Sequence, residues 1–372
     1  MASSLRRDDP PATAAAPARP AAPRRRALPV LARHLAAAAL ALAAIAALTF
    51  LVGPLEHLRI ARVGYLLLAV AGLQILVGAS GQVSLGHGAF MFVGAYTTAL
   101  TVLHAPAVPL AGVMVLAVAA GCLAGVLVGA ATARLHGPYL AGATLALAVG
   151  LPALALYFSD LLGGSNGLRF ALRGTPPELS GLLTDNQWKA LVVWLTVLTA
   201  LVVLATLSRG RLGRRMRAVR DDESAAAMAG IPVGRTRVTA FVVSAGCASL
   251  AGACEAYLLG TATPSSFSLA LSLSLLAALV LGGLGSLWGA LWGALALVYL
   301  EAAGRELADL LGLGSSVADN LPPVFFGVML VVIVTAWPTG VHGALRRLGG
   351  LSARQRTPNP PSDPPSITTT GA

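Results

Sequence analysis

The stretch Val192-Val-Trp-Leu-Thr-Val-Leu-Thr-Ala-Leu-Val-Val-Leu-Ala-Thr-Leu207 decides the fold, because as a helix it has almost no polar face. A second stretch, Ala277–Leu300, has the same character. A helix that is hydrophobic all round lies inside a large core or in lipid. About 20 consecutive apolar residues cross the hydrocarbon core of a bilayer, and this chain holds many such runs. Lipid is therefore the expected solvent.

The composition of the whole chain supports the same solvent. Of its 372 residues, 56% are hydrophobic and 11% are charged, whereas a soluble domain has about 25% charged residues. The net charge of +11 does not indicate a nucleic-acid partner, because the basic residues gather in tails and loops rather than on one face. Three cysteines without metal-ligand spacing, Cys122, Cys247 and Cys254, are expected to be small core residues.

Hydropathy predicts an all-α, polytopic integral membrane bundle with about ten transmembrane helices. The membrane domain covers residues 34–343, between two basic cytoplasmic tails, 1–33 and 344–372, that are expected to be disordered. The second and third spans meet at a Gly/Ser-rich break and could form one broken hairpin. The predicted spans are residues 34–54, 60–78, 86–103, 108–132, 138–159, 188–208, 238–260, 268–282, 286–303 and 320–337.

The distribution of basic residues predicts the orientation of the bundle. With the N-terminus inside, ten helices place 20 basic residues on the cytoplasmic side and 6 outside. Cytoplasmic loops of membrane proteins carry an excess of lysine and arginine, so both termini are expected inside. Two connections are long: residues 160–187, expected outside, and residues 209–237, expected in the cytoplasm.

The inventory of reactive residues argues against an enzyme. The chain has no HExxH motif, no GxSxG motif and no paired carboxylates at helical spacing within a span. A phosphate-binding P-loop needs a lysine directly after its second glycine, but the only lysine, Lys189, follows Asn186, Gln187 and Trp188. The chain is therefore expected to be non-catalytic and without a cofactor of its own, and any ATP-driven transport requires ATP-binding partner subunits.

One ionisable residue and two glycine-rich segments mark a candidate pathway. Glu255 is the clear ionisable residue within a predicted span, which makes it a functional candidate, with a structural, paired role as the alternative. Residues 78–88 and 282–289 are rich in glycine. Glycine permits close packing of helices or an unwound backbone beside a watery cavity, and both remain open here. The scarcity of other intramembrane charges weighs against an ion-coupled carrier.

A series of segments resembles one transporter family. They include Gly81-Gln-Val-Ser-Leu-Gly-His-Gly88 and its continuation to Tyr96, and Gly213-Arg-Arg-Met-Arg-Ala-Val-Arg-Asp-Asp-Glu223 and its continuation to Ile231. Taken together and in their order along residues 60–345, these segments and those given below resemble the branched-chain amino-acid ABC-transporter permeases of the LivH/LivM type, and more specifically the LivM type. Glu255 departs from the family, which more often has a small or apolar residue there. The other matching segments are Gly137–Ala146, Gly163–Leu168, Pro264–Phe267, Leu281–Ala290 and Pro338–Gly340.

The resemblance implies a permease subunit of an ABC importer for branched-chain, apolar amino acids, working by alternating access in the plasma (inner) membrane of a bacterium. It also implies four kinds of partner: a second homologous permease, two ATP-binding subunits, an extracytoplasmic solute-binding protein and membrane lipid, with no nucleic acid. ABC permeases for urea, short amides, sugars or another small polar solute are the alternative within the class. An ion-coupled secondary transporter is the alternative from another class.

The expected site residues form three groups, and no metal ligands are expected. The zwitterion of the solute would meet the backbone near Ser84, Gly86 and His87. Residues 214–229 are predicted to form one amphipathic helix, the coupling element for the ATPase, that ends at Gly230 and Pro232. The pathway residues are Gly81, Gln82, Ser84, Gly86, His87, Tyr139, Thr144 and Glu255. The coupling residues are Arg217, Arg220, Asp221, Glu223, Ala226 and Gly230, and the external-loop residues are Gly163, Gly164, Asn166 and Gly167.

Overall fold

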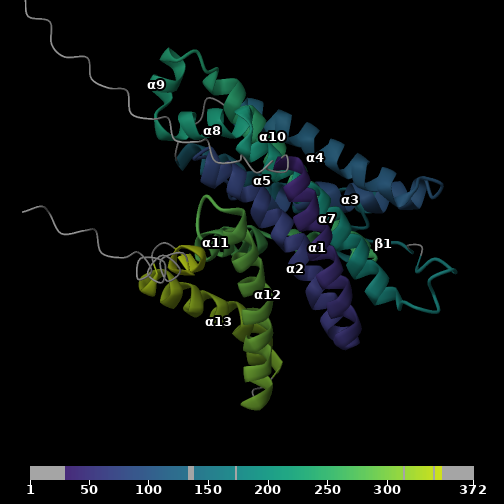
Figure 1. The fold of residues 1–372 in the computed structure, drawn as a ribbon. Helices are drawn as coiled ribbons and strands as arrows, with labels where there is room; N and C mark the ends of the chain where they lie inside the picture. The colour runs from purple at the N-terminus through teal and green to yellow at the C-terminus, as the bar shows by residue number, and fades with distance from the viewer. Residues whose placement is uncertain (1–29, 133–137, 172–173, 313–314, 338–339, 346–372) are drawn as a thin grey trace, which may run out of the picture.

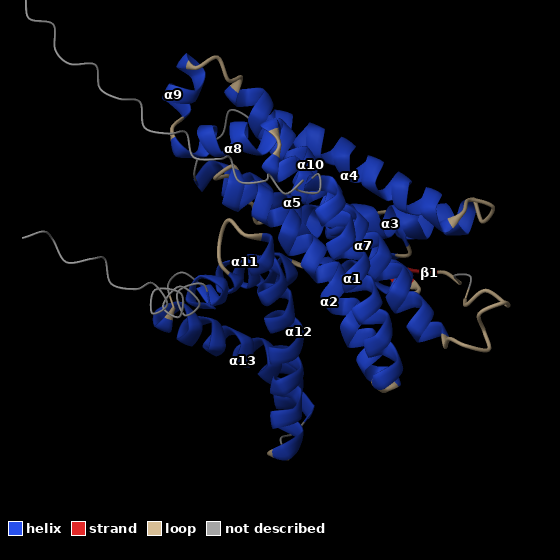
Figure 2. Cartoon of the chain, in the orientation of Figure 1, coloured by secondary structure: helices blue, strands red, loops and turns tan. Residues whose placement is uncertain are grey.

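The computed structural model describes residues 30–132, 138–171, 174–312, 315–337 and 340–345. Within these ranges the chain is a bundle of helices with two very short strands (Figure 1 and Figure 2). The two predicted tails fall almost entirely outside the described residues, and so do Arg134 and Arg173. The prediction of an all-α membrane bundle is confirmed.

A helix lies at each of the ten predicted spans. Eight helical segments in the described ranges are long and apolar enough to cross a membrane. They do not include α3 or α11, and α11 has only 14 residues. The number of spans and the N-in/C-in orientation therefore remain predictions. The ten helices are α1 (Val30–Leu51), α2 (Pro54–Leu73), α3 (His87–His104), α4 (Leu110–Thr132), α5 (Pro138–Tyr157), α7 (Asp185–Arg209), α10 (Val233–Leu259), α11 (Leu269–Gly282), α12 (Leu287–Leu310) and α13 (Ser315–Ala336).

Shorter elements join these helices. A π-helix, η1 (Gln74–Ala79), continues α2 without a break. Strand β1 (Leu168–Arg169) pairs antiparallel with β2 (Thr261–Ala262), so that Leu168 lies opposite Ala262. The remaining elements are α6 (Ser159–Leu162), η2 (Gly164–Asn166), α8 (Arg211–Asp221), α9 (Glu223–Met228) and η3 (Pro264–Phe267).

Helix α2 begins earlier than the predicted span, which started at residue 60, and the six basic residues counted on the outer side included Arg59 and Arg62. The helix begins at Pro54, after the extended residue Gly53, because proline at the first helical position fits the fixed φ and needs no N–H partner. Glu56 in the first turn also suits the positive end of the helix dipole. Arg59 and Arg62 therefore lie within the helix.

The core of the bundle is built by small residues where α3, α4 and α10 cross. A Cβ on Gly94 of α3 would lie 1.7 Å from the carbonyl oxygen of Ser249 on α10, and a Cβ on Gly252 would lie 1.9 Å from the carbonyl oxygen of Met91. Only glycine permits such a close approach of two helix backbones. The hydroxyl of Ser249 donates to the carbonyl oxygen of Ala117 on α4 at 2.6 Å, which adds α4 to the same crossing.

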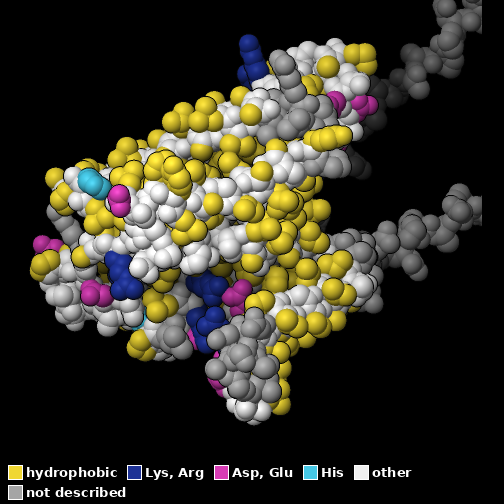
Figure 3. Space-filling view, turned by 180° about the vertical axis from the view of Figure 1, so that it is seen from behind, with side chains coloured by type: hydrophobic (Ala, Val, Ile, Leu, Met, Phe, Trp, Pro, Cys, Tyr) yellow, Lys and Arg dark blue, Asp and Glu magenta, His cyan; other side chains and the backbone are white. Residues whose placement is uncertain are grey.

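The periphery of the bundle is apolar and faces outward. Helix α1 has almost no fully buried residue and presents Leu35 and Leu40, while α13 presents Val328 and Val331. Figure 3 shows one face of the molecule covered largely by hydrophobic side chains, with the charged side chains in a few small groups. Such a surface is unfavourable in water and suits lipid acyl chains.

Candidate functional site

The glycine-rich segment 78–88 unwinds between α2 and α3. The last turn of α2 widens into η1, the chain then runs without a helix, and α3 starts at His87. Short π-helical segments are rare and occur frequently at functional sites. Burial alternates along the unwound stretch, since Gln82 and Ser84 are buried whereas Gly81 and Val83 are exposed. The polar side chains of this predicted pathway segment therefore turn into the protein.

Helices α5 and α11 close over the unwound stretch. The backbone N–H of Leu85 donates to the hydroxyl of Thr144 on α5 at 3.0 Å, and the N–H of Gly88 donates to the hydroxyl of Ser272 on α11 at 2.9 Å. A Cβ on Gly86 would lie 2.7 Å from the carbonyl oxygen of Thr144. The structure thus brings Thr144, another predicted pathway residue, together with the 81–88 segment, and adds Ser272.

Two further predicted pathway residues contact backbone groups of neighbouring helices. The buried ring of His87 donates from Nε2 to the carbonyl oxygen of Ala69 on α2 at 2.9 Å, since a carbonyl can only accept. The side-chain amide of Gln82 donates to the carbonyl oxygen of Arg237 on α10 at 3.3 Å. Both side chains fasten the unwound stretch to the core.

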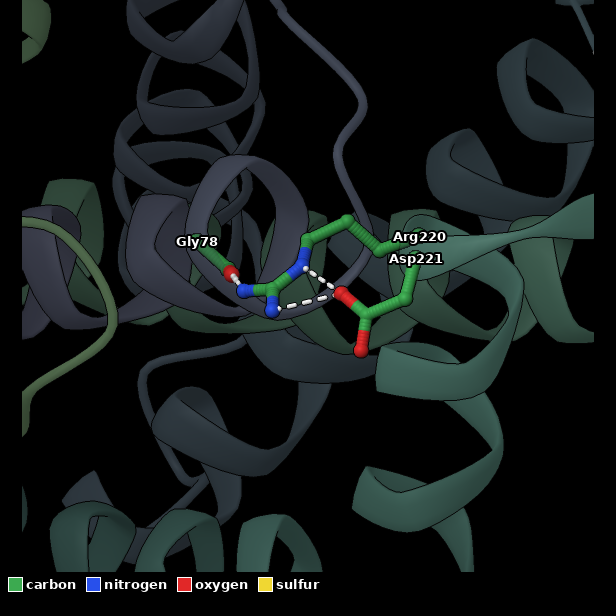
Figure 4. A network of polar contacts seen from close by, with 3 residues as sticks. All are labelled: Gly78, Arg220 and Asp221. Atoms are coloured by element: carbon green, nitrogen blue, oxygen red, sulfur yellow. Dashed lines mark hydrogen bonds and ion pairs between the residues drawn. The ribbon is translucent and has the colours of Figure 1, made fainter.

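Arg220 of α8 links the long loop 209–237 to this segment (Figure 4). Its Nη1 donates to the carbonyl oxygen of Gly78 at 2.6 Å, while Nε and Nη2 donate to Oδ1 of Asp221 at 2.9 and 2.7 Å. Gly81 lies against the same side chain, because a Cβ there would be 2.8 Å from Cγ of Arg220. We call Gly78, Gly81, Arg220 and Asp221 the inner junction. The guanidinium group of Arg220 thereby donates to a carbonyl group near the end of η1, where the last carbonyl groups of a helix have no N–H donor from the helix itself.

The predicted single helix 214–229 is wrong: the structure has two helices, α8 and α9, with a break at Asp222. Asp222 has an extended backbone, and its side chain accepts from the N–H of Ala225 at 2.9 Å. Aspartate is a strong N-cap, because its side chain satisfies a free N–H of a new first turn. The predicted stop is confirmed, since α9 ends before Gly230, which has φ +78°.

The other coupling residues also contact the bundle. Arg237 at the start of α10 forms an ion pair with Glu223 at the start of α9. The side chain of Ala226 is buried, and Nη1 of Arg217 donates to the carbonyl oxygen of Ser208 at 3.2 Å. The loop 209–237 is therefore packed against the membrane helices rather than free of them.

The second glycine-rich segment meets the first through Gln74, which the sequence analysis missed. The side-chain Nε2 of Gln74 donates to the carbonyl oxygen of Gly283, and the N–H of Gly285 donates to its Oε1, both at 2.7 Å. The turn between α11 and α12 is thus fixed to η1. A lone amide within the apolar run of the predicted span 60–78 was the available signal, since a polar group in a span needs a partner.

Two predicted pathway residues are not buried in this cluster. Tyr139, near the start of α5, is 77% exposed. Glu255 is buried in α10 about 27 Å along the helix from Arg237, at 1.5 Å per residue. It interacts electrostatically with Arg62 of α2, whose Nη2 forms an ion pair with Glu301 of α12 at 2.8 Å. The structure therefore places Glu255 in a charged cluster at the other end of the bundle.

The predicted external-loop residues form a compact turn. Gly163, Gly164 and Gly167 have positive φ, and Asn166 lies in η2 between them. A Cβ on Gly167 would lie 2.2 Å from the carbonyl oxygen of Ala262. The turn is therefore fixed against β2. No group of three or more His, Cys, Asp or Glu side chains in the described ranges is placed to hold a metal ion.

Comparison with known proteins finds relatives over most of the chain. The family described as branched-chain amino acid transport system / permease component matches residues 58–334. The high-affinity branched-chain amino acid transport system permease protein LivM of Escherichia coli (strain K12) is 35% identical over 268 residues, which are 65% of this chain and 61% of LivM. The chain thus matches less than two thirds of the length of that relative.

Two more distant relatives extend this picture. The high-affinity branched-chain amino acid transport system permease protein LivH of Salmonella typhimurium is 24% identical, over 75% of this chain and 91% of LivH. The L-arabinose transport system permease protein AraH of Escherichia coli (strain K12) is 34% identical over 91 residues, 24% of this chain and 27% of AraH.

Proposed function

Because this multi-pass inner-membrane chain belongs to the branched-chain amino acid transport system / permease component family, we propose that it is the permease subunit of an ABC importer for branched-chain amino acids. It provides the transmembrane pathway and works by alternating access. ATP is bound and hydrolysed by two separate subunits. No step in this chain is catalytic.

The observation that carries the proposal is the inner junction. Arg220 lies on the long loop outside the spans and contacts Gly78 and Gly81 of the unwound segment. An ATPase that moves α8 and α9 therefore moves the end of α2 directly. Gln74 continues the connection to the turn between α11 and α12. This chain of contacts supports a role in transmitting force from a partner.

The proposed solute site and the proposed outer docking surface involve other residues than the inner junction. The zwitterion meets backbone groups of the 84–87 stretch, and small and apolar side chains suit leucine, isoleucine or valine. The solute-binding protein docks near residues 160–187, where the compact turn at Gly163 and Gly167 offers a fixed surface.

Helix α5 supports the proposal of a second, homologous permease. Gly142, Ala146 and Gly150 follow each other at four-residue spacing, so they lie on one face of α5, and all three are exposed. In the described part of the chain, and apart from adjacent residues and the backbone of α5 itself, no atom lies within 4 Å of a Cβ built on Gly142 or Gly150. Small residues at this spacing let a second helix approach closely in lipid. Helix α1 presents alanines at the same spacing, Ala39, Ala43 and Ala47, but α5 has glycine at two of its three positions, which lets a partner helix approach more closely.

Reconstitution tests the proposal. The chain is placed in proteoliposomes alone, and together with a second permease, the ATPase subunits and a binding protein. We expect uptake of labelled isoleucine only in the complete set with ATP, and none when the ATPase carries an inactivating substitution. Gradient-driven uptake by the chain alone would support a secondary transporter instead. Uptake of urea or L-arabinose in place of isoleucine would overturn the substrate but keep the class.

A further inference from the structure

Four arginines lie where α7 ends and α8 begins, and they carry exposed positive charge. We call Arg209, Arg211, Arg214 and Arg215 the corner cluster; all four are exposed. Within the described part of the chain none of them has a carboxylate partner, in contrast to Arg220, which pairs with Asp221, and Arg237, which pairs with Glu223. The positive charge of the cluster is therefore not neutralised by these residues of the chain and can bind an external anion.

The position of the corner cluster relative to the bilayer follows from α1 and α7. Both helices are apolar and long enough to cross a membrane, and α7 ends at Arg209. The side chain of Arg209 hydrogen-bonds to Nε2 of His34, near the start of α1, at 2.7 Å. Two adjacent spans therefore reach the membrane surface at this point, which is the level of the lipid headgroups.

The backbone adds to the attraction for an anion. The N-cap of α8 is Gly210, which supplies no side-chain acceptor for the free N–H groups of the first turn. A helix N-terminus attracts negative charge and disfavours cations, yet Arg211 and Arg214 stand in this first turn. A Cβ on Gly213 would lie 1.9 Å from the carbonyl oxygen of Ser208, so α8 is fixed close to the end of α7. A bound phosphate would relieve the repulsion at this turn.

We propose that the corner cluster binds the phosphate headgroup of an anionic phospholipid such as phosphatidylglycerol. Guanidinium groups bind phosphate oxygens with paired hydrogen bonds, and the acyl chains would lie along the exposed apolar side chains of α1. An ATPase is the less suitable occupant. The α9 end of the loop, with Met228 85% exposed, lies at the opposite end of α8 from the cluster, about 16 Å away by helix length. This inference does not depend on the proposed transport function.

Lipid-dependent stability of the purified full chain tests the proposal. Its thermal unfolding is followed in detergent micelles with added phosphatidylglycerol or phosphatidylcholine, because a ligand of the folded state raises the melting temperature. We expect phosphatidylglycerol to stabilise the chain more, and Arg214→Gln with Arg215→Gln to weaken its apparent affinity about tenfold or more. The double variant Arg214→Lys with Arg215→Lys should keep most of the preference.

The matched control removes two charges elsewhere. Arg169→Gln with Arg305→Gln changes two exposed arginines outside the cluster and should leave the lipid preference unchanged. An equal loss in both double glutamine variants would show an effect of net charge and overturn the proposal. Competition by inorganic phosphate at millimolar concentration would show a free-anion site instead. Loss of ATPase co-purification with an unchanged lipid preference would assign the surface to the ATPase.

Discussion

The two ends of α2 are attached to α12 and its preceding turn by different chemistry. At the end that begins with Pro54, Arg59 and Arg62 face two glutamates of α12, at 3.7 Å and 2.8 Å. At the other end, Gln74 makes two hydrogen bonds of 2.7 Å to backbone groups of the 283–285 turn. Coulomb attraction falls slowly with distance, whereas a hydrogen bond weakens steeply with misalignment. The hydrogen bonds of Gln74 therefore fix the position of the 283–285 turn relative to η1. The ion pairs of Arg59 and Arg62 hold α12 against α2 while tolerating small shifts between the two helices.

The largest effect is expected at the Arg62 end. Arg62→Glu places a carboxylate beside Glu301 and near Glu255, and should lower the free energy of unfolding by roughly 3–4 kcal/mol. Adding Glu301→Arg should restore part of the loss, because the pair is reversed. Thermal unfolding of the purified protein measures both. Arg169→Glu on β1, at an exposed arginine without an ion pair in the described ranges and away from α12, is the control. Equal melting temperatures for Arg62→Glu and wild type would show that the pair does not hold α12.

The second effect is expected at the Gln74 end. Gln74→Leu leaves the carbonyl of Gly283 and the N–H of Gly285 without their partners, and should cost about 2–3 kcal/mol. Thr199→Val on α7 is the control, since the hydroxyl of Thr199 donates only to Leu195 of its own helix. If both variants unfold alike, the Gln74 hydrogen bonds do not position the turn. The transport rate, measured in parallel, should fall only in Gln74→Leu.

The third effect separates transport from stability. Arg220→Gln removes the charged hydrogen bond to the carbonyl oxygen of Gly78 and should cost only about 1–2 kcal/mol. Transport should nevertheless fall about tenfold or more, because the inner junction connects the ATPase loop to α2. Arg235→Gln, at an exposed arginine of the same loop, should leave transport near the wild-type rate. A similar rate in Arg220→Gln and Arg235→Gln would contradict a transmitting role for the inner junction.

Local patterns in the sequence predict the helices well and their long-range contacts poorly. Apolar runs locate all ten helices, because the length needed to cross lipid is a property of each segment alone. Arg59 and Arg62 suggested a loop because their ion-pair partners on α12 could not be recognised from the sequence. Glu301, the partner of Arg62, lies 239 residues further along the chain. Charges that pair within the fold cannot be distinguished from loop charges by composition.

In the candidate site, too, the features with a local sequence signal were mostly predicted, and the long-range contacts were not. The glycine-rich segments were both recognised, since glycine density is a local signal. Their meeting through Gln74 was not, because it depends on how α2 packs against the turn at Gly283. The break at Asp222 was missed although its signal is local: an aspartate before a helix-forming run is an N-cap pattern. Alanine-rich helix propensity after Asp222 outweighed that pattern in the sequence analysis.

The smallest effect is expected at Gly81, within the inner junction. Its φ of +72° disfavours a side chain, which costs about 1 kcal/mol for alanine. The Cβ would also lie 2.8 Å from Cγ of Arg220, so that side chain must shift, whereas a Cβ on Gly167 would lie only 2.2 Å from a backbone carbonyl oxygen, which cannot move away as a side chain can. Gly81→Ala should therefore destabilise less than Gly167→Ala, while Gly142→Ala, inside helix α5 and with open space around its Cβ, should be slightly stabilising. Thermal unfolding ranks the three variants. If Gly81→Ala exceeds Gly167→Ala, Arg220 is held rigidly, and the inner junction is as inflexible as the Gln74 contact.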